Sequence, residues 1–207
     1  MRQTVHVAIY NTWADWEAGF ALAHLGSGDW SSPRKSYEIR LVGESPEPIA
    51  TKAGIMLTPD VVLADLEPKD SKMLILPGAE TWLAGANMAF VDAAEAFLGA
   101  GVPVAAICGA TIGLARGGLL NDVDHTSNAV QTLECSAYAG AARHTHDLAV
   151  TDGNLITASG IAPVEFAREI FKLLGFYDRA TIENWYLLYG EHNPAGFLGL
   201  MQGATDG

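Results

Sequence analysis

The chain has 207 residues, of which 49% are hydrophobic and 17% are charged. This length and balance are typical of a globular protein with one domain or at most two small ones. Lys and Arg total 12 against 24 Asp and Glu, which gives a formal net charge of -12. That charge repels phosphate backbones and anionic lipid surfaces, so we expect neither nucleic acid nor a membrane as a partner.

The N-terminal segment and the cysteine content indicate the compartment. The sequence reaches Asp15 and Glu17 before any long apolar region, so we expect neither a signal peptide nor a transmembrane helix. Cysteine occurs only at Cys108 and Cys135, and two thiols in a chain of this length do not make a disulfide framework. The sequence therefore predicts a cytoplasmic protein with free thiols.

Short apolar or β-branched runs alternate with helical patterns along the chain. Strands that are buried on both faces and alternate with helices are typical of an α/β protein with a mostly parallel sheet. The predicted strands are residues 4–10, 37–43, 72–78, 102–108, 147–151 and 154–160. The predicted helices are DWEAGFALAHL, WLAGANMAFVDAAEAFLGAG, TIGLARGGLL, APVEFAREIFKLLGF and DRATIENWYLLYG.

The remaining segments do not divide the chain. Residues 46–60 read as short extended pieces about a turn at Lys52 to Gly54, which predicts a small hairpin. Residues 27–36 read as a surface loop. We therefore predict a single domain over residues 1–207, with a Gly-rich tail that is poorly ordered from about residue 193.

Cys108 lies where a predicted strand, VAAI, meets a predicted helix, ATIGLARGGL. A tight turn there places the side chain at the carboxyl end of the sheet, where open α/β sheets bind ligands. The helix N-terminus then favours the thiolate, and Gly109 lets the backbone turn sharply. The alternative is that Cys108 is one more small buried hydrophobe.

An ordered set of motifs spans residues from about 4 to about 175. It comprises ADWE, LILPGAETW, AAICGATIGLARGGLL with HTSN after it, and DGNLITASGIAPVEFA. This set resembles the ThiJ/PfpI superfamily, in particular small bacterial members often labelled intracellular protease or amidase. The resemblance implies a class I glutamine amidotransferase-like, flavodoxin-like three-layer sandwich with a nucleophile elbow. It also implies a homodimer, for which the aromatic helix ENWYLLY offers an apolar surface.

The same resemblance assigns site residues. It makes Cys108 the nucleophile and Glu17 the acid that reaches it from the first helix. Backbone N–H groups of Gly78 or Ala79, with that of Gly109, would form an oxyanion hole. The plainer alternatives are a solvated first-turn carboxylate for Glu17 and a simple turn for Gly78.

Histidine is the point at which this sequence departs from the family pattern. Proteolytic members follow the elbow cysteine with histidine, whereas Gly109 follows it here, which disfavours a peptidase. Other members place a histidine in the strand after the elbow helix, which reads DHTSNAV here. Either His125 or Asn128 can occupy that place, the first as a base or orienting group. The late His-x-Glu of true glutaminases is absent.

Weaker signals concern substrate, metal and packing. Trp16 and Trp82 flank the proposed site and are candidates to line a substrate cleft, as is Asn128. His144 and His146 resemble a metal pair but fit a polar strand edge better, so we predict neither a metal nor a cofactor. Cys135, in a region read as helical, is expected to be a packed thiol, its side chain filling a gap in the core.

Two functions follow from these residues. The first is a cysteine-dependent hydrolase or lyase acting on a small carbonyl, amide or isonitrile-like substrate, with Cys108 attacking and Glu17 handling the proton. The family resemblance adds glyoxalase III-like, deglycase and hydratase activities to this class. The second is a non-catalytic redox or stress sensor in which Cys108 is oxidised and Glu17 stabilises the product.

Overall fold

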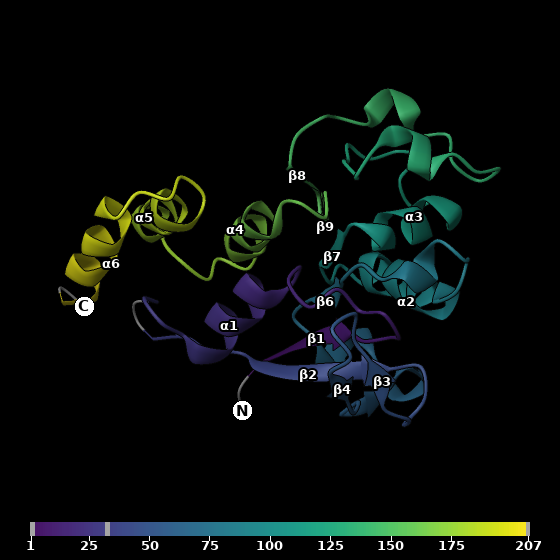
Figure 1. The fold of residues 1–207 in the computed structure, drawn as a ribbon, viewed down its shortest axis with the longest axis horizontal. Coiled ribbons are helices and arrows are strands. Elements are labelled where there is room, and N and C mark those ends of the chain that lie inside the picture. Colours follow the sequence, from purple (N-terminus) through teal and green to yellow (C-terminus); the bar gives the residue numbers. More distant parts are fainter. Residues whose placement is uncertain (1–2, 32–33, 206–207) are drawn as a thin grey trace.

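A seven-stranded sheet forms the centre of the protein in the computed structural model, which describes residues 3–31 and 34–205 (Figure 1). The strand order is β5-β2-β1-β6-β7-β9-β8, and only the edge strand β8 runs antiparallel to its neighbour. The strands are β1 (Thr4–Ala8), β2 (Glu38–Gly43), β5 (Val61–Val62), β6 (Leu74–Leu76), β7 (Val104–Ile107), β8 (Ala149–Asp152) and β9 (Leu155–Ala158). The mostly parallel α/β sheet predicted from the sequence is confirmed.

The inner strands owe their place to apolar side chains on both faces. Every residue of β6, β7 and β9 is buried, as expected for parallel strands covered by helices on both sides. The register pairs Leu76 with Ala106 and Ile107 with Ala158, so β6, β7 and β9 end at one edge of the sheet. The chain segments that follow these three strands therefore meet there, at the edge where such sheets bind ligands.

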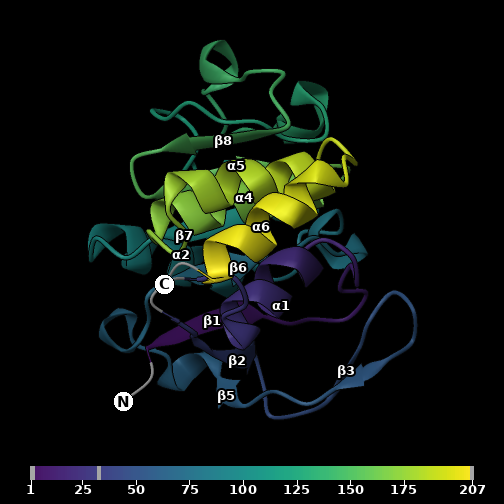
Figure 2. The same ribbon diagram turned by 90° about the vertical axis from the view of Figure 1, so that its left-hand side faces the viewer.

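Helices cover the sheet in layers (Figure 1). α1 and α4 lie on one face, and α2 and α3 lie on the other. α5 and α6 pack outside α4 as a further layer beyond the expected three, and they face the viewer in Figure 2. The helices are α1 (Gly19–Ser27), α2 (Met88–Gly99), α3 (Gly109–Arg116), α4 (Pro163–Leu173), α5 (Arg179–Tyr189) and α6 (Ala195–Thr205).

The predicted hairpin is present as a separate two-stranded sheet. β3 (Ile49–Ala50) pairs antiparallel with β4 (Met56–Leu57). The hairpin is attached to the turn that follows β1, because the Thr12 amide donates to Ala50 O at 2.8 Å and the Ala53 amide donates to a carboxylate oxygen of Asp15 at 2.9 Å. It therefore stands beside the edge of the main sheet at which β1 ends.

The expectation of a disordered C-terminal tail is wrong. Residues from 195 form α6, which packs on α5 and buries Leu200. A Cβ at Gly196 would lie 2.3 Å from Asn184 O, so glycine is what permits this close approach of two helices. α5 also turns Trp185 inward, so the large exposed apolar side chains at this end belong to α6 and are Phe197, Leu198 and Met201.

Two local predictions between α3 and β8 are also wrong. DHTSNAV is a loop with a single bridge at His125, and Cys135 lies in no α-helix but in a turn after a short 3-10 helix, Val130–Leu133. The amide of Thr126 is bonded to the Thr157 side chain, and Thr126 Oγ1 is bonded to the carbonyl of Asp147, so side chains take the place of a strand ladder here. No helix within 3–31 and 34–205 is long and apolar enough to cross a membrane.

Candidate active site

Cys108 occupies a strained turn between β7 and α3. Its backbone has φ 57° and ψ −122°, a conformation that costs a non-glycine residue about 1–3 kcal/mol. Its amide is bonded to Ala158 O at 3.0 Å, and its carbonyl accepts from the Thr111 hydroxyl at 2.6 Å. Gly109 is required beside it, because a Cβ there would lie 2.8 Å from Ala79 O. The elbow geometry predicted from the sequence is therefore present.

Glu17 lies in the turn just before α1 and is only 1% exposed. Its Oε2 accepts a hydrogen bond from the Gly78 amide at 2.6 Å. Its Oε1 has no nitrogen or hydroxyl partner among the described residues, and the neighbouring polar group is the Cys108 thiol. Burial raises the pKa of Glu17 to about 7, partly offset by its hydrogen bonds to Cys108 and Gly78. The alternative of a solvated carboxylate is excluded.

The thiol is not stabilised as a thiolate. Burial, and next the negative charge of Glu17, raise the pKa of Cys108 to about 11. The hydrogen bonds from Asn128 and from the Gly109 amide act in the opposite direction but are outweighed. The net direction favours the protonated thiol, against the expectation that the helix N-terminus favours the thiolate. Glu17 is the carboxyl beside this thiol.

Two glycines make room for this pair. A Cβ at Gly160 would lie 2.7 Å from Cys108 Sγ and 3.1 Å from Glu17 Oε1. A Cβ at Gly78 would lie 2.8 Å from Cys108 Cβ and 2.6 Å from Glu17 Oε2. Any side chain at either position would push thiol and carboxyl apart, so both glycines belong to the site for steric reasons.

Asn128, and not His125, faces the sulfur. Asn128 Nδ2 donates to Cys108 Sγ at 3.2 Å, and its Oδ1 accepts from the Gly160 amide at 2.7 Å. These two bonds fix the amide orientation. The two possibilities that the sequence left open are thus resolved in favour of Asn128.

His125 is placed elsewhere as a structural residue. It is fully buried, with Nδ1 2.8 Å from Val123 O and Nε2 2.8 Å from the Tyr138 hydroxyl. Both ring nitrogens are therefore engaged, which contradicts the expectation of a base at Cys108. Nearby, His144 Nε2 is 3.0 Å from Ser127 Oγ, and no group of three or more metal-ligating side chains occurs among the residues described.

The oxyanion donors also differ from expectation. The Gly78 N–H is already used by Glu17, so it is not free for a substrate. Ala79 lines the pocket, and the Gly109 N–H points at the Cys108 sulfur. Ala79 and Gly109 both line the pocket above the thiol, so their backbone amides remain the candidates for an oxyanion hole.

The pocket above Cys108 has a volume of about 240 Å³ and a mostly apolar lining. Trp16 forms one wall, is half exposed, and donates through Nε1 to Gly160 O at 3.1 Å. The full lining is Thr12, Ala14, Trp16, Glu17, Lys52, Gly78, Ala79, Glu80, Leu83, Cys108, Gly109, Ile112, Asn128 and Thr132.

Trp82 is not part of that lining. It is completely buried, donates from Nε1 to Pro77 O at 3.2 Å, and packs so closely under α3 that a Cβ at Gly113 would lie 2.2 Å from its ring. The prediction that Trp82 contacts substrate is wrong, because the ring lies in the core beneath the elbow. Its role is to support the turn from below.

Lys52 is one of the pocket residues that the sequence analysis missed, and it carries a charge. It belongs to the β3–β4 hairpin, and its Nζ is 2.7 Å from Glu80 Oε1 at the pocket wall. Its positive charge acts to lower the pKa of Glu17. Nothing in the local sequence points to this role, because it depends on the hairpin folding over the turn after β1.

The fold and the site together define a class of protein: an α/β protein with a strained cysteine at the carboxyl edge of a parallel sheet and a buried glutamate beside it. The model of the family described as DJ-1/PfpI matches residues 3–173. The chain belongs to the DJ-1/PfpI family.

Individual relatives agree over nearly the whole length. A Bacillus subtilis protein named "Uncharacterized protease YoaZ" is 37% identical over 200 residues, which is 95% of each chain. The crystal structure of a thiJ/pfpI family protein from Bacillus anthracis has a TM-score of 0.92 at 36% identity and covers 98% of this chain and 97% of its own. The DJ-1 superfamily protein Atu0886 from Agrobacterium tumefaciens has a TM-score of 0.82 at 32% identity, covering 93% and 100%.

Proposed function

We propose that the protein is a cysteine-dependent hydrolase or lyase that acts on a small carbonyl, amide or isonitrile-like substrate. One observation carries the proposal: the strained Cys108 thiol lies beside the buried carboxyl of Glu17 in a pocket of about 240 Å³. Strongly shifted titrating groups in a cleft are typical of catalytic sites. A pocket of this volume suits a small reacting group.

Proton transfer follows from the two pKa shifts. At neutral pH and above, the Glu17 carboxylate accepts the thiol proton as sulfur attacks an electrophilic carbon, and a carbon–sulfur bond forms. The electron pair displaced from the carbonyl is stabilised by the amides of Ala79 and Gly109. With an amide, Glu17, now a carboxylic acid, gives the proton to the leaving nitrogen as the carbon–nitrogen bond breaks and a thioester is left on Cys108. Water then attacks the thioester and gives a proton to Glu17, and Glu17 returns it to sulfur as the carbon–sulfur bond breaks and the acid leaves. With an aldehyde or an isonitrile, the proton goes to the adduct. Asn128 holds the sulfur in place throughout.

The relatives give independent support for hydrolysis. Two Bacillus subtilis proteins at 37% and 31% identity are named "Uncharacterized protease". Thiol attack on an amide carbonyl is the same chemistry as the step above. Because Gly109 follows the cysteine and both nitrogens of His125 are engaged, we assign the role of base to Glu17.

Thiol labelling and turnover test the proposal together. Iodoacetamide labelling against pH is compared for the wild type, Cys108→Ser and Cys135→Ser, with aldehydes, amides and isonitriles screened as substrates. We expect Cys108→Ser to lower turnover at least about 10³-fold while Cys135→Ser leaves it unchanged. Turnover that survives in Cys108→Ser would contradict the proposal.

A second candidate function is oxidation sensing through the same thiol. Two equivalents of peroxide convert the thiol to a sulfinic acid, with two molecules of water released. The raised pKa of Glu17 favours this reading, because a protonated carboxyl can donate a hydrogen bond to a sulfinate oxygen. Intact-mass measurement after peroxide treatment distinguishes the two. A stable gain of two oxygens on Cys108, with no turnover of any screened substrate, favours the sensor.

A further inference from the structure

A second hollow adjoins the candidate active site on the far side of Trp16. Its volume is about 530 Å³, and Trp16 lines both it and the pocket above Cys108. The remaining wall comes from α1, from the loop after it and from the end of α5. We call it the aromatic groove, and its lining includes Trp16, Phe20, His24, Asp29, Trp30 and Tyr189.

Aromatic rings and one carboxylate meet in this groove. The Tyr189 ring is 5.3 Å from that of Phe20 and 6.4 Å from that of Trp30, centroid to centroid. Asp29 supplies a negative charge, and its ion pair with Arg34 is long, at 3.7 Å, and exposed on both sides. Such a pair is weak and is readily exchanged for another cation. Aromatic faces beside a carboxylate are typical of sites for alkylammonium or guanidinium groups.

His24 adds an unpaired donor to the same wall. It is 92% buried, since 8% of its surface is exposed, and Nε2 accepts a hydrogen bond from Trp185 Nε1 at 3.0 Å. An indole N–H is a donor only, so in the neutral ring the proton must lie on Nδ1. Burial lowers the pKa of His24 to about 4, which keeps the ring neutral at physiological pH. Nδ1 has no partner within the described ranges.

An orphaned buried donor points to an acceptor that the protein itself does not supply. The Trp30 ring lies over His24 at 5.2 Å between centroids, tilted by 33°. Because Nδ1 is buried, the groups that cover it must move before a ligand in the groove can accept its proton. A ligand that fits both features carries a cation for the rings and Asp29, and a carbonyl oxygen for His24.

We infer that the aromatic groove binds a basic side chain and a neighbouring carbonyl of the substrate, and therefore that the substrates are small amides bearing an alkylammonium or guanidinium group. This inference rests on the proposed function, because it names the substrate class of the Cys108 site. Trp16 is the wall over which the two parts of such a substrate are joined. The net charge of -12 attracts cations toward the protein generally, and the groove supplies the specific contact.

Calorimetric binding of two matched probes to the Cys108→Ser protein tests the groove without any chemistry. The probes are Nα-acetyl-lysine N-methylamide and its norleucine analogue, which lacks only the ammonium group. We expect the lysine probe to bind about five- to thirtyfold more tightly. Asp29→Asn and Tyr189→Leu should remove most of that preference, while Asp65→Asn, an exposed acid elsewhere, should leave it unchanged.

Equal binding of the two probes, no binding of either, or a preference insensitive to both groove variants would overturn the inference. Failure of the proposed function reads out differently. The wild type would then bind the lysine probe selectively, with sensitivity to Asp29→Asn, yet hydrolyse neither basic nor neutral amides. Turnover of neutral carbonyl compounds without selective binding of the lysine probe would support the Cys108 chemistry and overturn the inference about the groove.

Discussion

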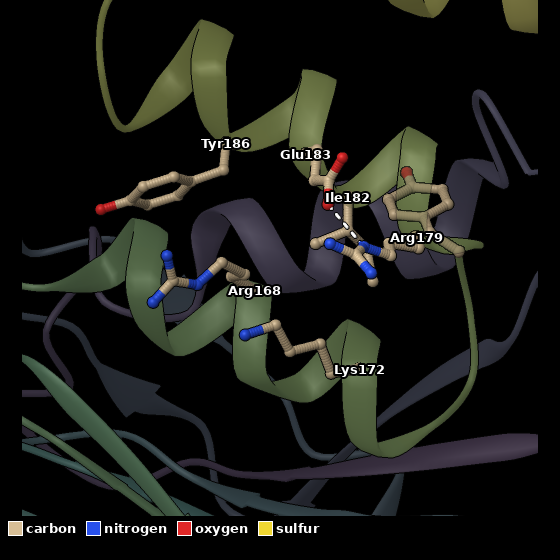
Figure 3. Close-up of a pocket in the computed structure, with 7 residues that line it drawn as sticks. Arg168, Lys172, Arg179, Ile182, Glu183 and Tyr186 are labelled. Carbon is tan, nitrogen blue, oxygen red and sulfur yellow. Dashed lines mark hydrogen bonds and ion pairs between the residues drawn. The ribbon is translucent and has the colours of Figure 1, made fainter.

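The pocket above Cys108 and the hollow between α4 and α5 handle charge in opposite ways. In the hollow, side chains of both helices point toward one another (Figure 3). Arg179 Nε is 2.7 Å from Glu183, and the Arg168 guanidinium lies 4.1 Å above the Tyr186 ring. Lys172 Nζ is 2.9 Å from a carboxylate oxygen of Glu169, so each cation here has a partner. Beside Cys108, by contrast, the buried Glu17 has the thiol as the polar neighbour of its Oε1, with no nitrogen or hydroxyl partner for that oxygen among the described residues.

The contrast shows what sets a reactive site apart from a charged surface. Exposed and paired charges change stability little, however many gather in one hollow. A single buried carboxyl beside a strained thiol costs stability and shifts both pKa values, which makes proton transfer available at neutral pH. The difference can be tested by removing one group at a time.

The largest effect is expected from Glu17→Gln on catalysis. Glutamine keeps the hydrogen bond from Gly78 but cannot accept the thiol proton, so kcat/KM should fall by about 10²- to 10⁴-fold. Wild-type kcat/KM should rise with pH through about 7 as Glu17 ionises, and this rise should be absent in the variant. The exposed Glu183→Gln serves as the control. A variant with wild-type activity and pH profile would contradict the role of base.

Glu17→Gln, which lowers activity, should raise the stability of the folded protein at neutral pH relative to the wild type. The folded chain holds the Glu17 proton up to about pH 7, whereas the unfolded chain loses it near 4.5. The folded state therefore binds more protons between these values, and stability falls as pH rises across the window, by up to roughly 3 kcal/mol. In Glu17→Gln this fall should be absent. Denaturant unfolding at pH 5 and pH 8 measures it, and identical pH dependence in both proteins would refute the prediction.

A smaller effect is expected from Asn128→Ala. The variant loses the bond to Cys108 Sγ and the bond from the Gly160 amide, so the sulfur is less well positioned and kcat/KM should fall roughly tenfold. Asn154→Ala, at the turn between β8 and β9, removes an amide far from the pocket and serves as the matched control. Equal effects of both variants would show that Asn128 is only structural.

The smallest effect is expected in the α4–α5 hollow. Arg179→Gln removes an i,i+4 pair with Glu183 at the surface of α5. Because both side chains are largely exposed, we expect no measurable change in melting temperature and none in turnover. A clear loss of activity would mean that this hollow communicates with Cys108, and the contrast between the two regions would then fail.

Much of the fold is readable from local sequence. The six predicted strands match β1, β2, β6, β7, β8 and β9, because short apolar or β-branched runs between helical patterns have few other places in an α/β domain. The prediction of a poorly ordered tail failed because its glycines are typical of loops, whereas Gly196 and Gly199 let α6 pack closely against Asn184. The segment around His125 failed because side-chain hydrogen bonds replace a strand ladder there.

The site residues were predictable only where residues close together in the sequence determine the local geometry. Cys108 and Gly109 form their turn locally, and the motif around Glu17 is next to the first strand. Gly78 was read as a free donor, because the bond that occupies it comes from 61 positions away. Burial outweighs the helix N-terminus at the thiol, and the depth of a side chain cannot be read from neighbours in sequence.

The β3–β4 hairpin has a consequence for how this scaffold can diversify. It is fastened to the turn after β1 by backbone and Asp15 contacts and shares no ladder with the seven-stranded sheet. Residues can be inserted or exchanged at its tip without disturbing any register in the main sheet. The same hairpin carries Lys52 to the pocket wall, so substitutions in it change the rim of the pocket. Cys108 and Glu17 lie on other segments. Substrate selectivity can therefore change during evolution through the hairpin, while Cys108 and Glu17 keep their positions.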